Sequence, residues 1–154
     1  MMDDRLFRDA MGKFATGITV VTTDYENEVM GMTVNAFMSI SLDPKLIAIS
    51  IDESASMYDI LQETKKFGVS ILTEKQKDLS MIFAKQIEKD REINFLQQDD
   101  IPVIEESLVT LSCHVQDMVE AGDHMIFIAE VSEIIINEGA PILYANGQYH
   151  SIVK

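Results

Sequence analysis

The stretch of residues 31–44 carries the residue types best suited to holding a small ligand. Hydroxyl and amide side chains alternate there with apolar ones, and no charge occurs before Asp43. In an extended backbone, a period of two sends Ser39 and Ser41 to one face and apolar side chains to the other. The apolar set is Met38, Ile40 and Leu42. An uncharged polar face suits a ligand held by hydrogen bonds, but the same pattern also fits a strand with one solvated face.

A serine-rich turn follows the apolar run at 46–51, with the sequence DESAS at 52–56. Ser56 and Asp59 have the spacing of a capping box, which predicts that a helix begins there. The free N–H groups and the dipole at a helix N-terminus favour an anion such as a phosphate. Serines at this position also serve simply as helix caps, so an anion site and a plain cap both remain open.

The sequence AGDH at 121–124 lies between two apolar runs, which places His124 at the mouth of a strand pair. His124 is therefore a candidate ligand-contacting residue. It equally fits a turn histidine that hydrogen-bonds Asp123 or the backbone. His114 is predicted to be solvated on the strand face opposite Cys113, which is predicted to be a buried structural cysteine.

Other catalytic centres find no support in the residue spacing. The three histidines stand in separate segments without H-x-x-x-H or C-x-x-C spacing, which predicts no metal site. No G-x-S-x-G motif marks a nucleophilic serine. If the protein is an enzyme, we expect a cofactor to supply the chemistry.

The bulk composition limits the class of protein. A length of 154 residues predicts one domain over 1–154. A formal charge of -14 disfavours nucleic-acid binding, because that affinity depends on neutralising phosphates with cations. No apolar run is long enough to span a bilayer, and the first residues lack a secretory pattern, so we expect a cytoplasmic protein with no membrane partner.

The elements that must position these residues are mostly strands. Helices are predicted after Asp3 or Asp4, after Ser56 and after Thr73, where Thr73 and Gln76 form a second capping box. Strands are predicted at 18–23, 29–34, 46–51, 67–72, 101–103, 109–115, 125–136 and 149–153, with turns at 24–28 and 146–147. Residues 85–100 are predicted to form a helix end and a long polar connection. The absence of a βαβ rhythm and of G-x-G-x-x-G or P-loop motifs favours an antiparallel barrel with flanking helices over a Rossmann fold.

Taken together, several blocks resemble the flavin reductase-like domain with the FMN-binding split barrel, the short-chain reductase of two-component monooxygenases. The blocks are FRDAM at 7–11, FATGITVVTT at 14–23, GMTVNAFMSISLDP at 31–44, FGVSIL at 67–72, AGDH at 121–124, PILY at 141–144 and GQY at 147–149. They follow the family's order over nearly the whole chain. The charged segment 88–98 departs from the family, since it lacks the tryptophan and the glycine-rich character common there.

The resemblance implies a fold and an activity. The fold would be mostly β, an antiparallel six-stranded Greek-key split β-barrel with flanking helices, assembled as a homodimer with flavin near the interface. The activity would be hydride transfer from NADH or NADPH to FMN or FAD, with the reduced flavin passing to a monooxygenase. The alternatives are a non-catalytic flavin- or haem-binding barrel and a flavin-free acidic interaction module.

The resemblance also implies the site residues. His124 would stand near the flavin ring, where a nicotinamide stacks, as the catalytic residue. Residues on the strand at 33–39 would line the ring and ribityl chain, those at 50–56 would approach the phosphate, and Phe83 and Lys85 would cover the phosphate end. The complete cofactor-binding set is Thr33, Val34, Asn35, Ala36, Ser39, Ser50, Ile51, Asp52, Ser54, Ser56, Phe83, Lys85 and Tyr149.

Overall fold

The computed structural model describes residues 2–153, and strands dominate its secondary structure, as the sequence predicts. In chain order the elements are α1 (Asp4–Gly12), β1 (Thr16–Gly17), β2 (Thr19–Tyr25), β3 (Glu28–Val34), β4 (Phe37–Leu42), β5 (Lys45–Asp52), α2 (Ser56–Thr64), β6 (Lys66–Ile71), the 3₁₀ turn η1 (Glu74–Gln76), α3 (Lys77–Phe83), β7 (Phe95–Gln98), β8 (Ile101–Ile104), β9 (Val109–Ala121), β10 (His124–Ile136), β11 (Ile142–Ala145) and β12 (Gln148–Ser151).

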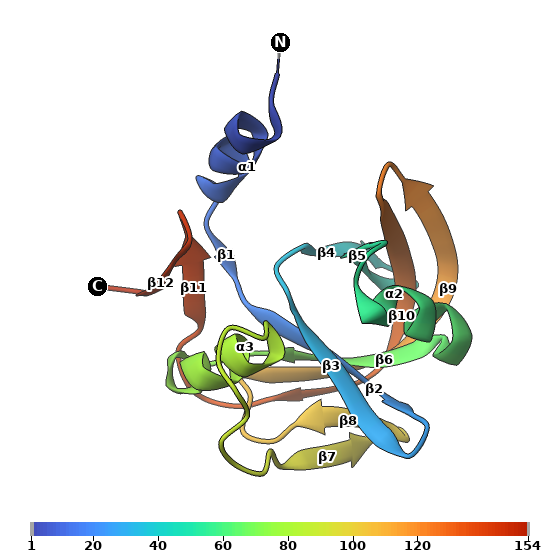
Figure 1. The fold of residues 1–154 in the computed structure, drawn as a ribbon. Helices are drawn as coiled ribbons and strands as arrows, with labels where there is room; N and C mark the ends of the chain where they lie inside the picture. Colours follow the sequence, from blue (N-terminus) through green and yellow to red (C-terminus); the bar gives the residue numbers. More distant parts are fainter. Residues whose placement is uncertain (1, 154) are drawn as a thin grey trace.

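The main sheet contains seven strands in the order β3–β2–β6–β9–β10–β5–β4, and every neighbouring pair is antiparallel. The sheet curls, so that the edge strand β3 comes back into contact with β5 (Figure 1). The antiparallel, mostly β class is therefore confirmed. The count of six strands is not, because residues 37–42 fold back on β5 as an additional edge strand.

Two smaller sheets complete the fold. β1, β11 and β12 form one, and the hairpin of β7 and β8 forms the other. The strand β7 lies inside the segment predicted as a polar connection. Asp99 and Asp100 both adopt left-handed backbone angles, with φ of 54° and 56°, and these angles close the tight hairpin turn.

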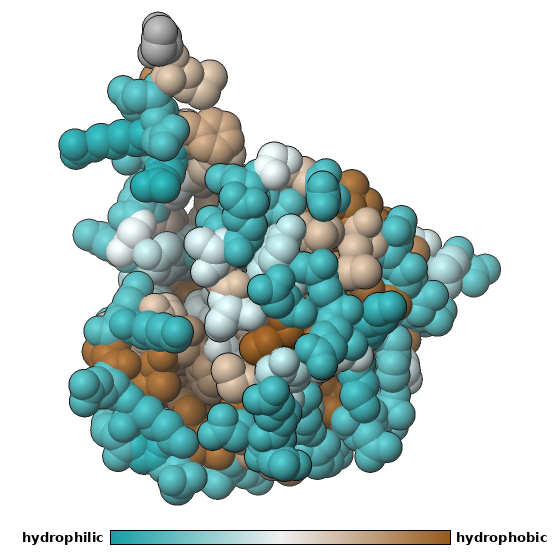
Figure 2. Space-filling view, turned by 45° about the vertical axis from the view of Figure 1, so that its right-hand side comes forward, coloured by the Kyte–Doolittle hydropathy of each residue, from teal (hydrophilic) through white to brown (hydrophobic). Residues whose placement is uncertain are grey.

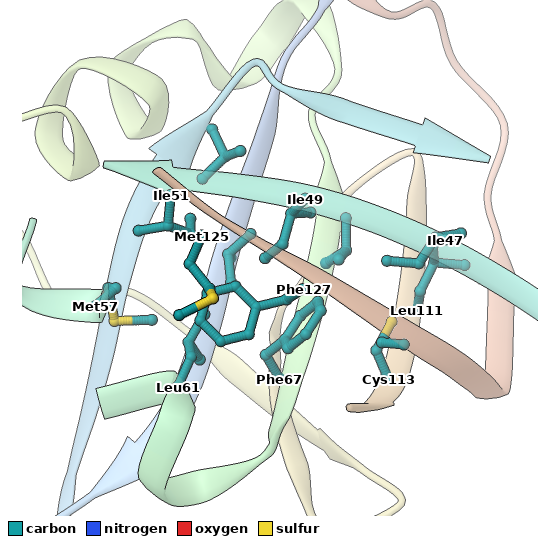
Figure 3. Close-up of a cluster of buried hydrophobic side chains, with 14 of the residues drawn as sticks. Ile47, Ile49, Ile51, Met57, Leu61, Phe67, Leu111, Cys113, Met125 and Phe127 are labelled. Atoms are coloured by element: carbon teal, nitrogen blue, oxygen red, sulfur yellow. The ribbon is translucent and has the colours of Figure 1, made fainter. Parts of the chain in front are cut away.

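The larger hydrophobic core lies between the curled sheet and α2. Figure 3 shows the rings of Phe67 and Phe127 near its centre, with Met57 and Leu61 of α2 packed beside them. Cys113 belongs to this core and is fully buried, as predicted. A second, smaller core, formed by Ile18, Val20, Leu72, Ile104 and Ile142, packs against side chains of α3.

The helix starts test the predicted caps. The side chain of Asp3 accepts the N–H of Leu6, and Thr73 and Gln76 form both hydrogen bonds of a capping box, so these two predictions are confirmed. The capping box predicted from Ser56 and Asp59 is wrong. Ala55 occupies the N-cap position of α2 and makes no side-chain cap, because the turn brings Ser56 into the first helical position.

The strand β4 departs from the predicted alternation. Its pairing with β5 shifts register between Ser39 and Ser41, where a β-bulge opposes an extra residue to the partner strand. A strict period of two therefore does not hold across Ile40. Met38, Ile40 and Leu42 are exposed, although they were predicted to form one apolar face.

The helix α1 stands apart from the body of the fold (Figure 1). None of its residues is buried, and Leu6, Phe7 and Met11 are more than half exposed, as is Phe14 after the helix. Within residues 2–153, none of the helices combines the length and the apolar character needed to cross a bilayer.

Candidate functional site

A cleft of about 730 Å³ opens between the α1–β1 segment and the β4–β5 hairpin. Figure 2 shows the arm that carries α1 separated from the body by a notch. The lining is mostly apolar, with Asn35 and Ser50 among its few polar members. The lining residues are Met11, Gly12, Phe14, Thr16, Asn35, Ala36, Phe37, Met38, Ala48, Ile49, Ser50, Ile126 and Tyr144. A flat apolar ring with a polar edge is the kind of ligand that such a lining suits.

A second cleft, of about 150 Å³, adjoins the first because both include Asn35 and Tyr144 in their walls. It is more polar. Its remaining lining residues are Ile18, Thr33, Ser80, Ala84, Gln86 and Tyr149. The two clefts therefore form one continuous depression with an apolar part and a polar part.

The turn at Asn35 and Ala36 separates β3 from β4 and forms the common edge of the depression. The N–H of Phe37 donates to the Asn35 carbonyl at 3.0 Å, and the N–H of Ser50 donates to the Ala36 carbonyl at 3.1 Å. Both carbonyls are thus engaged. In residues 2–153 no group accepts a hydrogen bond from the N–H of Asn35 or Ala36, so both amides can donate to a ligand.

One face of the β5–β10 ladder leads from the large cleft to His124. Ser50 pairs with Ile126, and both line the cleft. Two residues further along, Asp52 pairs with His124. Since side chains two apart in a strand share a face, Asp52 and His124 continue the cleft wall outward.

The imidazole of His124 is oriented by its neighbour. Its Nδ1 lies 2.8 Å from Oδ1 of Asp123. An ionised carboxylate only accepts hydrogen bonds, so Nδ1 carries the proton and Nε2 is left to face a ligand. The side chain of His124 is 39% exposed. The predicted alternative, a turn histidine bonded to Asp123, is therefore confirmed as geometry, and within residues 2–153 no group bonds the other ring nitrogen.

Asp52 completes the polar group around His124. Its Oδ1 accepts both the N–H and the hydroxyl of Ser54, each at 2.8 Å. These two bonds, and to a smaller extent the nearby His124, lower the pKa of the Asp52 carboxyl. The N–H of Glu53 donates to the Asp123 carbonyl at 2.9 Å and ties the two turns together.

Ligating atoms of Asp52, Asp123 and His124 lie within 4.8 Å of one another, which is close enough to surround a cation. Each carboxylate already accepts a hydrogen bond, from Ser54 or from His124. The sequence-based expectation that the protein has no metal site therefore stays a prediction.

The predicted anion turn has fewer free donors than the sequence indicates. Ser54 uses its N–H and its hydroxyl on Asp52, and the N–H of Ala55 donates to the Asp52 carbonyl. What remains for an anion is the first turn of α2, which has no side-chain cap. Ser56 is exposed at that end.

A network of hydroxyl groups supports the polar cleft. The hydroxyl of Thr33 donates to the Ser80 carbonyl at 2.6 Å, and the hydroxyl oxygens of Ser80 and Tyr149 lie 2.9 Å apart. Sequence reasoning missed Ser80 as well as Gln86, Ile126 and Tyr144. Neither helix periodicity nor a motif singles out Ser80, whereas Tyr144 stands in a quoted family block.

The predicted site residues do not all meet. Asn35, Ala36 and Ser50 line the large cleft; Thr33 and Tyr149 line the polar cleft. Asp52, Ser54 and His124 cluster at the strand mouth.

The remaining predicted residues have other surroundings. The side chains of Val34 and Ile51 belong to the hydrophobic core, so only their backbone could reach a ligand. Phe83 packs edge-on against Phe95 in the smaller core. Ser39, Ser56 and Lys85 line neither cleft. Lys85 follows α3 with a left-handed φ of 60°.

Comparison with known proteins shows the same fold and family over almost the entire chain. Residues 11–153 match the family model described as flavin reductase like domain. An NADH-dependent flavin reductase of Rhodococcus is 37% identical over 94% of this chain and 84% of its own length. The reductase component of a flavin-dependent trigonelline monooxygenase from Acinetobacter baylyi is 36% identical over 97% of the chain, which spans 49% of that longer protein.

Two solved structures superpose closely. The flavin reductase PheA2 is 52% identical, with a TM-score of 0.97 and coverage of 99% of this chain and 100% of that one. The NADH:FAD oxidoreductase SgcE6 of Streptomyces globisporus, in complex with NAD and FAD fragments, is 30% identical, with a TM-score of 0.91 and coverage of 99% and 96%.

Proposed function

Because the chain belongs to the family of flavin reductase-like domains, we propose that it transfers hydride from NADH to a flavin and supplies the reduced flavin to a separate monooxygenase. The observation that carries the proposal is the family match over residues 11–153 together with the bipartite depression at Asn35 and Ala36. The relatives compared above are named as NADH-dependent reductases or as the reductase component of a monooxygenase.

The residues of the depression fit a flavin. The apolar wall of Met38 and Ile126 would contact the ring system, and the free amides of Asn35 and Ala36 would meet its polar edge. The hydroxyls of the polar cleft suit a ribityl chain. The uncapped first turn of α2 would attract the phosphate. The net charge of -14 is unfavourable, but oriented N–H groups act at short range, whereas distant charges are screened.

When bound, the flavin supplies the hydride acceptor, and the protein supplies orientation and electrostatics. The amides of Asn35 and Ala36 would stabilise negative charge that builds at the polar edge during reduction. His124 would orient the nicotinamide, since Asp123 fixes its tautomer and Nε2 can accept a hydrogen bond from the carboxamide N–H.

The proposal includes assembly as a homodimer of split barrels, with six strands of the curled sheet forming a Greek key. The apolar side chains on α1 and β4 support an interface, because α1 buries none of its own residues. Exposed apolar surface of this kind marks a contact between proteins. Sedimentation equilibrium would test it: a mass near 35 kDa, about twice the chain mass of 17.3 kDa, supports the dimer, and a monomer contradicts it.

The test of the activity is anaerobic stopped-flow mixing of the protein with excess FMN or FAD and either NADH or NADPH. Loss of oxidised-flavin absorbance near 450 nm over many turnovers is expected, with NADH preferred. The same traces identify the preferred flavin. Flavin that binds without reduction by either nicotinamide would contradict the reductase function and leave a flavin-binding barrel.

We place the protein in the cytoplasm, where NADH is available, and fractionation of the source cells would test this.

The single domain over 1–154 is likewise proposed, and one cooperative unfolding transition followed by two independent probes would support it.

A further inference from the structure

We infer that Ser80 is a positioning residue that fixes two walls of the polar cleft at once. The inference rests on the proposed function, because it assigns that cleft to the flavin. Ser80 lies in α3 and is only 1% exposed. Its hydroxyl and its carbonyl are both engaged: Oγ lies 2.9 Å from the hydroxyl oxygen of Tyr149, and the carbonyl accepts the hydroxyl of Thr33 at 2.6 Å.

The ring of Tyr149 is held on several sides. Besides the bond to Ser80, the Lys77 ammonium lies 5.2 Å from the ring centroid, and the Tyr144 ring meets it edge-on at 5.2 Å between centroids. Lys77 and Ser80 are three residues apart, so they share a face of α3. One turn of this helix therefore contacts both the face and the hydroxyl of the tyrosine.

The two walls come from opposite ends of the chain. Thr33 lies near the end of β3, 47 residues before Ser80, whereas Tyr149 lies on β12, 69 residues after it. Without Ser80 nothing else in residues 2–153 hydrogen-bonds the Tyr149 hydroxyl, so the ring would keep only its contacts with Lys77 and Tyr144 and would be held less firmly. A flavin entering the cleft would then have to order the ring itself, which weakens binding.

The experiment uses Ser80→Ala, which removes the hydroxyl and keeps the carbonyl that holds Thr33. Tyr149→Phe removes the same bond from its half-buried partner and keeps the ring that packs on the smaller core. Flavin affinity is measured by fluorescence quenching for both single variants and the double variant. We expect each single variant to bind flavin about fivefold more weakly, and the double variant to bind no more weakly than either, because one bond is lost in all three.

The matched control is Ser70→Ala. Ser70 is another fully buried serine, and its hydroxyl accepts the N–H of Ile104 away from both clefts. This variant should lose stability without a change in flavin affinity. The kcat of Ser80→Ala at saturating flavin should stay within about twofold of the unchanged protein, since the bond orients the cleft and takes no part in hydride transfer.

Equal flavin affinities for Ser80→Ala and the unchanged protein would overturn the inference, as would additive losses in the double variant. A second readout needs no flavin: the ¹³C-ring NMR signal of Tyr149 should move in Ser80→Ala and stay in place in Ser70→Ala. An unchanged Tyr149 signal in Ser80→Ala also overturns the inference. A chain that binds no flavin at all contradicts the proposed function, and the NMR result still decides whether Ser80 holds Tyr149.

Discussion

Two histidines of this chain each pair with an aspartate, and the two pairs differ in what they connect. His114 lies on β9 and contacts Asp99, in the turn between β7 and β8, at 2.9 Å; Ser132 of β10 donates to the same carboxylate at 2.6 Å. His124 pairs with its own neighbour Asp123 at 2.8 Å. The histidine side chains are similarly exposed, at 41% and 39%.

The difference separates a structural pair from the pair that we propose to act in ligand binding. The His114 pair, with Ser132, joins β9 and β10 to the turn between β7 and β8 and helps to fix that hairpin on the main sheet. The His124 pair joins no distant elements; it orients one ring at the mouth of the cleft. The exposure of the histidines and the distances to their aspartates do not distinguish the two pairs. The number of residues between the bonded groups does.

The largest effect is expected where the β7–β8 hairpin meets the sheet. In Gly68→Ala the new Cβ would collide with the Pro102 carbonyl oxygen and would lie 2.7 Å from Val103. The hairpin must move away, and we expect the free energy of unfolding to fall by about 3 kcal/mol or more. Urea unfolding measures it. Gly17→Ala, with nothing within 4 Å of the new Cβ, is the control, and an equal loss in both would refute this account.

At the other pair, His124→Ala should affect turnover. We expect kcat to fall about tenfold to a hundredfold through poorer orientation of the nicotinamide, while the flavin Kd changes by less than about threefold. Steady-state kinetics and flavin titration measure the two quantities. Equal losses in turnover and in flavin affinity would count against the positioning role.

The counterpart variant, His114→Ala, should leave kcat unchanged and lower the Tm by about 1–3 °C, the scale expected of an exposed pair. Differential scanning calorimetry and the same kinetic assay measure these effects. A fall in turnover comparable to that of His124→Ala would remove the distinction between the pairs.

The smallest effect concerns acid stability. The hydrogen bonds from Ser132 and then His114 lower the pKa of Asp99 below its ordinary value. A carboxyl whose pKa is lower in the folded state contributes stability that is fully present above its unfolded pKa, about 3.9, and is lost as the pH falls through the folded value. Asp99→Asn should therefore be less stable at pH 6, and the gap should narrow toward pH 2.5. Urea midpoints across that range measure it, and a constant gap would contradict the linkage.

Much of the fold follows from local sequence signals, because hairpin turns, β-branched strands and the cap at Asp3 depend only on residues a few positions apart. The sequence signal failed where a distant partner decided the structure. The register shift in β4 depends on its pairing with β5, and β7 forms because β8 is there to receive it. The cap predicted at Ser56 failed because the preceding turn, with Ser54 bonded to Asp52, places Ala55 at the N-cap.

The candidate site shows the same contrast between residues marked by local motifs and residues placed by distant partners. Asn35, Ala36 and His124 stand in motifs that can be read along the chain; Asn35 and Ala36 line the large cleft, and His124 lies at the strand mouth. His114 is exposed to solvent, as predicted, but its contact with Asp99, 15 residues away, was not predicted. Ser80 escaped notice for the same reason: its partners are 47 and 69 residues distant, and a serine in a helix carries no signal of its own.

The burial of Cys113 also affects its oxidation, because this protein produces reduced flavin. Reduced flavin that meets oxygen before its acceptor yields hydrogen peroxide, which attacks thiolates. Burial raises the pKa of the Cys113 thiol to about 12, so this sulfur stays protonated and out of contact with the oxidant. Oxidative damage would therefore begin at exposed thioethers such as those of Met11 and Met38, which line the large cleft.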